Sequence, residues 1–156
     1  MGQMDVARLN PEELRAFITA LLGDVHVLER MLAAGMIESD QHRIGCEQEM
    51  FLVDRASKPF PIAMALLGRL DDPSFATELG RFNLETNVDP RQFHGDCLSQ
   101  IEEELGSKLS KVRAAAHDMH ADVVLTGILP TLRKSDLGIE NLTPKQRYHA
   151  LNEAMT

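Results

Sequence analysis

The sequence predicts one α+β domain with a mixed or antiparallel sheet. Its 156 residues, of which 44% are hydrophobic and 26% charged, are sufficient for a single folded core. Two segments alternate apolar and polar residues with a period of two, and longer segments repeat apolar residues every three or four positions. One-sided alternation is typical of antiparallel or mixed sheets, because the strands of parallel sheets are buried on both faces. We therefore expect long amphipathic helices to pack on one face of the sheet.

The first expected element is a long amphipathic helix between Asn10 and Gly35. Asn10 followed by Pro11 and two acidic residues is typical of a helix start, and Gly35 is a suitable C-cap. The apolar residues of this helix recur at three- and four-residue steps: Leu14, Phe17, Leu21, Val25, Leu28 and Leu32. This stripe suits packing on the domain core or on a second copy, and we expect a homo-oligomer.

Two strands are expected next, over residues 43–53 and 81–88. In each of them apolar and polar residues alternate, so that one face is apolar and the other carries most of the polar side chains. A turn and a short helix over residues 61–70 connect the two strands. Asp89 and Pro90 are expected to end the second strand.

The remaining elements are a helix, a strand and a second helix. Apolar spacing predicts the first helix over residues 96–119, and an apolar run predicts a third strand within residues 122–130 that ends in a loop. Thr143 followed by proline is expected to open the last helix.

Charge, cysteine spacing and hydropathy exclude several classes of protein. The formal net charge is −8 and we find no basic stripe, which argues against nucleic-acid binding. Cys46 and Cys97 have no CxxC spacing, so neither a disulfide framework nor a zinc knuckle is expected. The start of the chain does not look like a signal peptide, and no apolar run approaches the ~18 residues that cross a bilayer. We therefore expect a cytoplasmic protein that does not bind membranes.

Three glutamates on the polar faces of the predicted strands are candidate metal ligands. Glu47 and Glu49 lie two apart, so their side chains share a face about 7 Å apart along the strand. Glu85, flanked by Asn83 and Asn87, completes the group if the two strands are neighbours. Carboxylate and amide oxygens suit Mg²⁺ or Mn²⁺ better than zinc. The alternative is that these acids only protect an edge strand from aggregation.

Sequence motifs in the same strands point to a known family. Residues 45–54 have the sequence Gly-Cys-Glu-Gln-Glu-Met-Phe-Leu-Val-Asp. This run resembles the Gly-x-Glu-x-Glu-x-x-Leu-Val-Asp strand that opens the catalytic domain of glutamate–cysteine ligase family 2, also called carboxylate–amine ligases. Residues 83–87, the helix after Pro90, residues 125–130 and residues 147–151 are similar to later segments of that family, in the same order.

The resemblance implies a partial glutamine synthetase-like sheet that uses ATP and Mg²⁺ or Mn²⁺. In such ligases, including those of glutathione biosynthesis, a glutamate-like carboxylate is phosphorylated to an acyl phosphate, which a small amine then attacks to give an amide. Carried over by position, the implied metal ligands are Glu47, Glu49 and Glu85. The resemblance also implies close backbone approach to the cofactor at Gly45, and a contact at Asn87 either to the substrate or to a metal ligand. It implies substrate contacts at Arg147 and Tyr148, with packing of the helix as the alternative role of Tyr148.

Two departures from the family pattern matter. Many members have a Gly-Thr-His-Pro-like run in the third segment, where residues 127–130 place Leu129 at the position of the histidine. Family members are also much longer than this chain. We therefore expect residues 1–42 to be an N-terminal helical segment and residues 43–156 to be the first, truncated part of a catalytic domain, inactive alone. The alternative is a non-catalytic binding or oligomerisation module that keeps part of the ligase fold.

Overall fold

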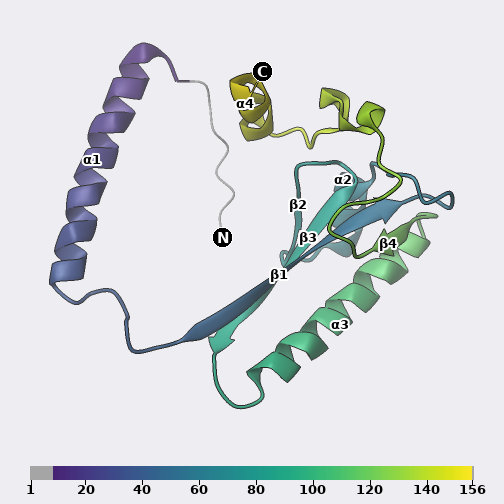
Figure 1. The fold of residues 1–156 in the computed structure, drawn as a ribbon, viewed down its shortest axis with the longest axis horizontal. Helices are drawn as coiled ribbons and strands as arrows, with labels where there is room; N and C mark the ends of the chain where they lie inside the picture. Colours follow the sequence, from purple (N-terminus) through teal and green to yellow (C-terminus); the bar gives the residue numbers. More distant parts are fainter. Residues whose placement is uncertain (1–8, 156) are drawn as a thin grey trace.

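The computed structural model describes residues 9–155, which contain a four-stranded sheet with helices on one face (Figure 1). The strand order is β2-β3-β1-β4, and all three pairings are antiparallel. The strands are β1 (Arg43–Val53), β2 (Phe75–Thr77), β3 (Asn83–Gln92) and β4 (Asp122–Val124). Helices α2 (Ala63–Leu70) and α3 (Cys97–His117) cover one face. The expected α+β class is confirmed.

The core lies between the sheet and the helices α2 and α3. Leu52 of β1 and Leu84 of β3 are fully buried there against Leu66 of α2 and Val112 of α3. The residues that alternate with them along the strands point away from the helices, and Glu47 and Glu49 of β1 are exposed. The alternation in the sequence therefore assigns the apolar side chains to the helix-covered face and the carboxylates to the opposite face.

Strand β3 is longer than the sequence analysis predicts. It continues through Asp89 and Pro90 to Gln92, because the register shifts between Cys46, which pairs with Val88, and Ile44, which pairs with Arg91. The extra residue lies in β3 as a bulge, where a proline is tolerated. The expectation that Asp89 and Pro90 end the strand is wrong for this reason.

Strand β2 was not predicted. It has three residues, too few for a period of two to be recognised, and it pairs with residues 84–86 of β3. The turn before it is held by Asp72, whose carboxylate accepts hydrogen bonds from Ser74 and from Lys111 of α3. These contacts hold the pKa of Asp72 well below its ordinary value, mainly because of the Lys111 ammonium. The third predicted strand is also shorter than expected, since β4 ends at Val124.

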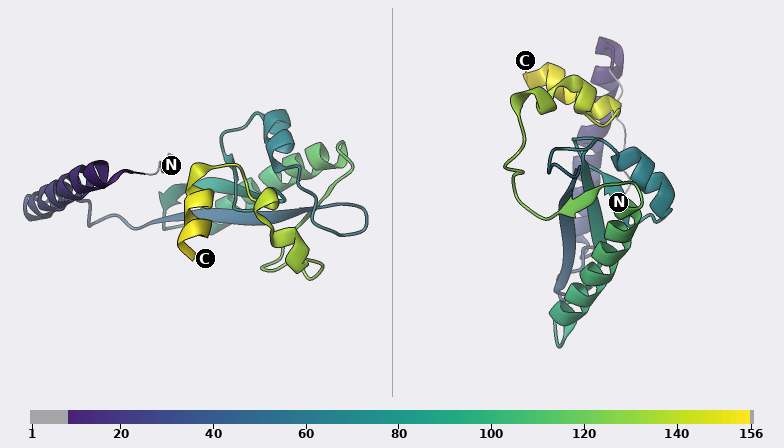
Figure 2. Two further views of the ribbon diagram at one scale, coloured as in Figure 1. Left: turned by 90° about the horizontal axis from the view of Figure 1, so that it is seen from above. Right: turned by 90° about the vertical axis from the view of Figure 1, so that its right-hand side faces the viewer.

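Helix α1 (Pro11–Ala33) forms where predicted but does not pack on the sheet. Asn10 and Glu13 make a reciprocal capping box at its start, and Gly35 has a φ of +65°, the left-handed conformation that suits a residue after a helix end. No residue of α1 is buried, and the helix stands apart from the sheet in Figure 1 and in the left view of Figure 2. The expectation that the long helices pack together on one face therefore holds for α3 and is wrong for α1. Across the described residues, no helix is both long and apolar enough to span a membrane.

The C-terminal segment lies beside the β2–β3 loop. It contains two 3₁₀ turns, η1 (Lys134–Leu137) and η2 (Ile139–Asn141), and helix α4 (Gln146–Met155), which begins three residues later than the expected start at Thr143. Backbone hydrogen bonds of 2.8 Å run from Arg81 N–H to the Asn141 carbonyl and from Thr143 N–H to the Leu79 carbonyl. The segment therefore fixes the loop that connects β2 to β3.

Candidate metal centre

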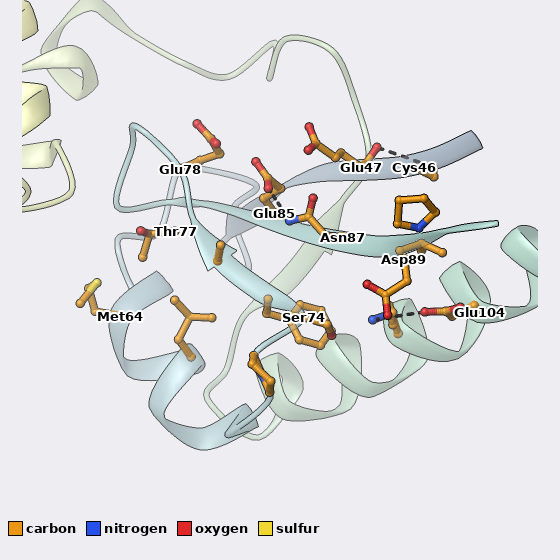
Figure 3. Close-up of a pocket in the computed structure, with 18 of the residues that line it drawn as sticks. Cys46, Glu47, Met64, Ser74, Thr77, Glu78, Glu85, Asn87, Asp89 and Glu104 are labelled. Carbon is orange, nitrogen blue, oxygen red and sulfur yellow. Dashed lines mark hydrogen bonds and ion pairs between the residues drawn. The ribbon is translucent and has the colours of Figure 1, made fainter. Parts of the chain in front are cut away.

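The sheet face that the helices leave uncovered gathers carboxylates from three segments. Glu49 of β1 lies directly opposite Glu85 of β3 in the strand register. Glu78 follows β2 and approaches them from the next segment of the sheet. One carboxylate oxygen of each of these three residues lies within 4.8 Å of the others. Figure 3 shows Glu78 and Glu85 on the same side of the sheet as Glu47 and Asn87.

We call Glu49, Glu78 and Glu85 the carboxylate cluster. Two of its members, Glu49 and Glu85, are predicted ligands. Glu47 shares their face but pairs with Asn87 one step further along the strands, outside the cluster. Glu78 was missed by sequence reasoning, because its position follows from the three-residue strand β2 that no pattern in the sequence revealed. The metal-binding role of Glu47, Glu49 and Glu85 stays a prediction.

The electrostatics of the carboxylate cluster favour a bound cation. The pKa of Glu78 is raised, first because burial removes its carboxyl group from water, and then because it contacts Glu85 and feels the charges of Glu85 and Glu49. Glu85 accepts a hydrogen bond of 2.6 Å from the side-chain amide of Asn87. Asn87 therefore orients one carboxylate, and a divalent cation would relieve the repulsion among the three.

The carboxylate cluster borders an open groove of about 1320 Å³ that extends around the edge of the sheet at β2. Glu47, Glu78 and Glu85 line it together with Lys145 and Arg147 from the C-terminal segment. The groove thus presents both acidic and basic side chains, which is the mixture that a zwitterionic or phosphorylated ligand would need. Gly45 also lines it, and a methyl group added there would make only ordinary contacts, the closest at 3.6 Å. The predicted backbone approach at Gly45 stays a prediction.

Comparison with known proteins identifies the family. The family model of glutamate–cysteine ligase family 2 (GCS2) matches residues 43–156, which include the whole sheet and the carboxylate cluster. The chain belongs to glutamate–cysteine ligase family 2. No curated protein and no solved structure matches it. Membership of GCS2 implies a ligase of the glutamate–cysteine ligase type, and α1 lies outside the matched residues.

The two candidate substrate residues of α4 differ in their surroundings. Arg147 lines the carboxylate groove, whereas Tyr148 is buried in a separate apolar cavity of about 310 Å³ beside Phe51 and Phe82. The Arg147 guanidinium lies 4.6 Å from the centre of the Tyr148 ring and donates a hydrogen bond to its hydroxyl group. Leu129, which the resemblance places where many members have a histidine, is buried and offers no ligand atom. Arg147 is thus the better placed of the two for a ligand in the groove.

Thr143 holds the backbone at Glu78, a member of the carboxylate cluster, through a hydrogen bond. Its hydroxyl group donates to the backbone carbonyl of Glu78, and the side chain is 1% exposed. We expect Thr143→Val to lower the free energy of unfolding by about 1–2 kcal/mol, because the carbonyl loses this donor at a buried position. Chemical denaturation measures the change.

Thr77 provides a matched control for this substitution. It is 5% exposed, and its hydroxyl group has no hydrogen-bond partner among the described residues. Thr77→Val should therefore leave the free energy of unfolding unchanged or raise it slightly. Equal losses in the two variants would show that the contact between Thr143 and Glu78 contributes nothing.

Proposed function

We propose that this chain supplies the metal-binding face of an ATP-dependent carboxylate–amine ligase. The reaction would join a glutamate-like carboxylate to an amine through an acyl phosphate. The single observation that carries the proposal is the carboxylate cluster, Glu49, Glu78 and Glu85, which lies within the part of the chain that matches GCS2. Transfer of a phosphoryl group to a carboxylate brings several negative charges together, and such a face can hold the cations that offset them.

The residues present fit Mg²⁺ or Mn²⁺. All three ligands are carboxylates, and oxygen ligands are those that hard divalent cations prefer. Glu49, Glu78 and Glu85 would hold the ion, with Glu47 close by on the same face. When bound, the ion would neutralise charge on the phosphates and on the substrate carboxylate.

The other groove residues have roles that follow from their chemistry. Asn87 keeps the Glu85 carboxylate in one orientation through its hydrogen bond. Arg147 and Lys145 place positive charge on the wall of the same groove, where they would bind phosphate or the substrate carboxylate. The guanidinium group of Arg147 suits such planar anions because it can donate two parallel hydrogen bonds.

Binding of Mn²⁺ to the purified chain tests the proposal. We expect electron paramagnetic resonance to detect bound Mn²⁺, and we expect Glu49→Gln and Glu85→Gln each to weaken binding at least ~10-fold, because each removes a ligand. Glu103→Gln is the control, since Glu103 is exposed on α3 and does not line the groove. Unchanged affinity in the two cluster variants, or no bound Mn²⁺ in the wild type, would overturn the proposal.

The same samples can be assayed for chemistry with ATP, glutamate and hydroxylamine, which traps an acyl phosphate as a hydroxamate. We expect no hydroxamate from this chain alone, because the described residues leave the carboxylate face open to water and phosphoryl transfer needs a full set of positioned charges. Hydroxamate formation by the isolated chain would show that its face is sufficient for the first half of the reaction.

A non-catalytic oligomerisation module is the second candidate. The observation that favours it is the exposed apolar face of α1. The two candidates are distinguished by the Mn²⁺ experiment, because an oligomerisation module has no need of a metal-binding carboxylate cluster.

A further inference from the structure

Helix α1 carries an apolar stripe that nothing in the described chain covers. Ile18 belongs to this stripe in place of Phe17, which lies on its flank. The stripe residues are each between 45% and 58% exposed: Leu14, Ile18, Leu21, Val25, Leu28 and Leu32. The helix is 23 residues long, and it lies outside the part of the chain that matches GCS2. The GCS2 part of the fold therefore does not explain why this helix is amphipathic.

The spacing of the stripe is that of a coiled-coil seam. The six residues are separated alternately by four and three positions, so Ile18, Val25 and Leu32 occupy heptad position a, and Leu14, Leu21 and Leu28 occupy position d. The seam from Leu14 to Leu32 is about 27 Å long at 1.5 Å per residue. Gly23 falls at position f, on the side away from the seam, where it does not disturb packing.

We propose that α1 pairs with α1 of a second copy of this chain in an antiparallel coiled coil. In this arrangement position a of one helix packs against position d of the other, so Leu14 meets Leu32, Ile18 meets Leu28 and Leu21 meets Val25. The contact is isologous, because each residue pair occurs twice about a two-fold axis. The proposal does not depend on the proposed ligase function.

Charge complementarity at the flanking positions sets the orientation and the partner. Arg15 and Glu29 both occupy position e. In an antiparallel pair the e positions face each other, which brings Arg15 of each copy to Glu29 of the other. In a parallel pair, Asp24 at position g would instead face Glu29 twice, which is repulsive. The antiparallel form has one repulsive pair, Asp24 with its symmetry mate. It has two attractive pairs, each of Arg15 with Glu29 of the other copy.

The apolar flanks agree with this choice. Phe17 and Met31 occupy position g and face each other across the antiparallel pair, while Leu22 at position e faces its own symmetry mate. Phe17 is 54% and Leu22 is 59% exposed in the single chain. A second copy therefore covers the apolar side chains on both sides of the seam.

The test is the mass of the full chain by sedimentation equilibrium between about 5 and 500 μM. We expect the wild type to reach twice the monomer mass at the upper end, in a weak dimer, because the seam from Leu14 to Leu32 covers fewer than three heptads. Val25→Glu places a charge in the seam and should weaken the dimer at least ~10-fold. Val27→Glu is the matched control, since Val27 is also about half exposed but lies at position c, away from the seam; it should leave the mass unchanged.

Charge reversal tests the orientation. In the antiparallel pair Glu29→Arg places two arginines together and should weaken the dimer, and the double variant Arg15→Glu with Glu29→Arg should restore it. In a parallel pair Glu29→Arg would instead strengthen association through Asp24, which would overturn the proposed orientation. A monomer mass at every concentration would overturn the pairing itself. A lower unfolding temperature in Val25→Glu at a concentration where the wild type is monomeric would overturn it too, because loss of the dimer cannot account for that change and the stripe would then pack within one chain.

Discussion

Mn²⁺ should raise the unfolding temperature of the wild-type chain, and Glu85→Gln should reduce that rise by at least about half while stabilising the chain in EDTA. Without a cation, Glu49, Glu78 and Glu85 hold like charges close together. The pKa of Glu78 is raised first by burial of its carboxyl group and then by its contact with Glu85 and the charges of Glu85 and Glu49. Glutamine keeps the size of the side chain and the acceptor for Asn87 but removes one charge. We expect a gain of about 1 kcal/mol in EDTA, which corresponds to about 2–4 °C for a chain of this size.

Mn²⁺ should stabilise the wild-type chain by more than Glu85→Gln stabilises it in EDTA. A ligand present at ~100 times its dissociation constant stabilises the folded state by about 2.7 kcal/mol, which is about 5–10 °C here. Thermal melts followed by circular dichroism in EDTA and in MnCl₂ measure both effects. Glu103→Gln should behave as the wild type in both buffers. A Glu85→Gln chain that is less stable in EDTA would indicate that the carboxylate forms a stabilising contact, and the repulsion argument would then be wrong.

The expected destabilisation by the carboxylates in EDTA and the expected stabilisation by Mn²⁺ connect the sheet to the proposed function. The helix-covered face obtains its stability from buried apolar side chains, whereas the uncovered face carries charges that oppose folding until a ligand compensates them. Side chains that form a binding site often lower the stability of the folded state when no ligand is bound. The carboxylate cluster is therefore better explained by ligand binding than by protection of a strand edge, because Glu49 and Glu85 lie on β1 and β3, which are interior strands of the sheet.

The sequence was informative wherever a pattern was long and local. The exposure of β1 alternates from Arg43 to Leu52, and its predicted bounds of 43–53 agree with the structure. The cap at Asn10 depends only on neighbouring residues and is likewise confirmed. The end of β3 was wrong because a bulge opposite β1 depends on the partner strand, which local reasoning does not include.

The candidate site was predictable only in part, for the same reason. Glu49 and Glu85 follow from alternation and from antiparallel pairing, both of which are local patterns. Glu78 depends on a three-residue strand and on an anchor at Thr143, 65 residues later in the chain. Helix α1 shows the complementary limit, because its spacing indicates an apolar face but not what covers that face.

Leu84→Ala should be the most destabilising single substitution considered for this chain. Leu84 is 0% exposed and lies in the centre of the sheet, on β3 between the two neighbouring strands. Removing its side chain leaves a cavity in a small core, and comparable substitutions cost about 2–5 kcal/mol. The unfolding temperature should fall by roughly 7–14 °C, taking the middle of that range. Leu98→Ala is the control, because Leu98 on α3 is 57% exposed, and its effect should stay within about 0.5 kcal/mol.

The same variant separates the two faces of the sheet. Leu84 and Glu85 are consecutive residues of β3 and point to opposite faces, so a cavity beneath the sheet should not move the carboxylates that face the groove. At a temperature where Leu84→Ala is fully folded, its Mn²⁺ affinity should remain within about twofold of the wild type. A selective loss of Mn²⁺ binding in the folded variant would mean that packing under β3 controls the carboxylate geometry, and the two faces would then have to be treated as one coupled unit.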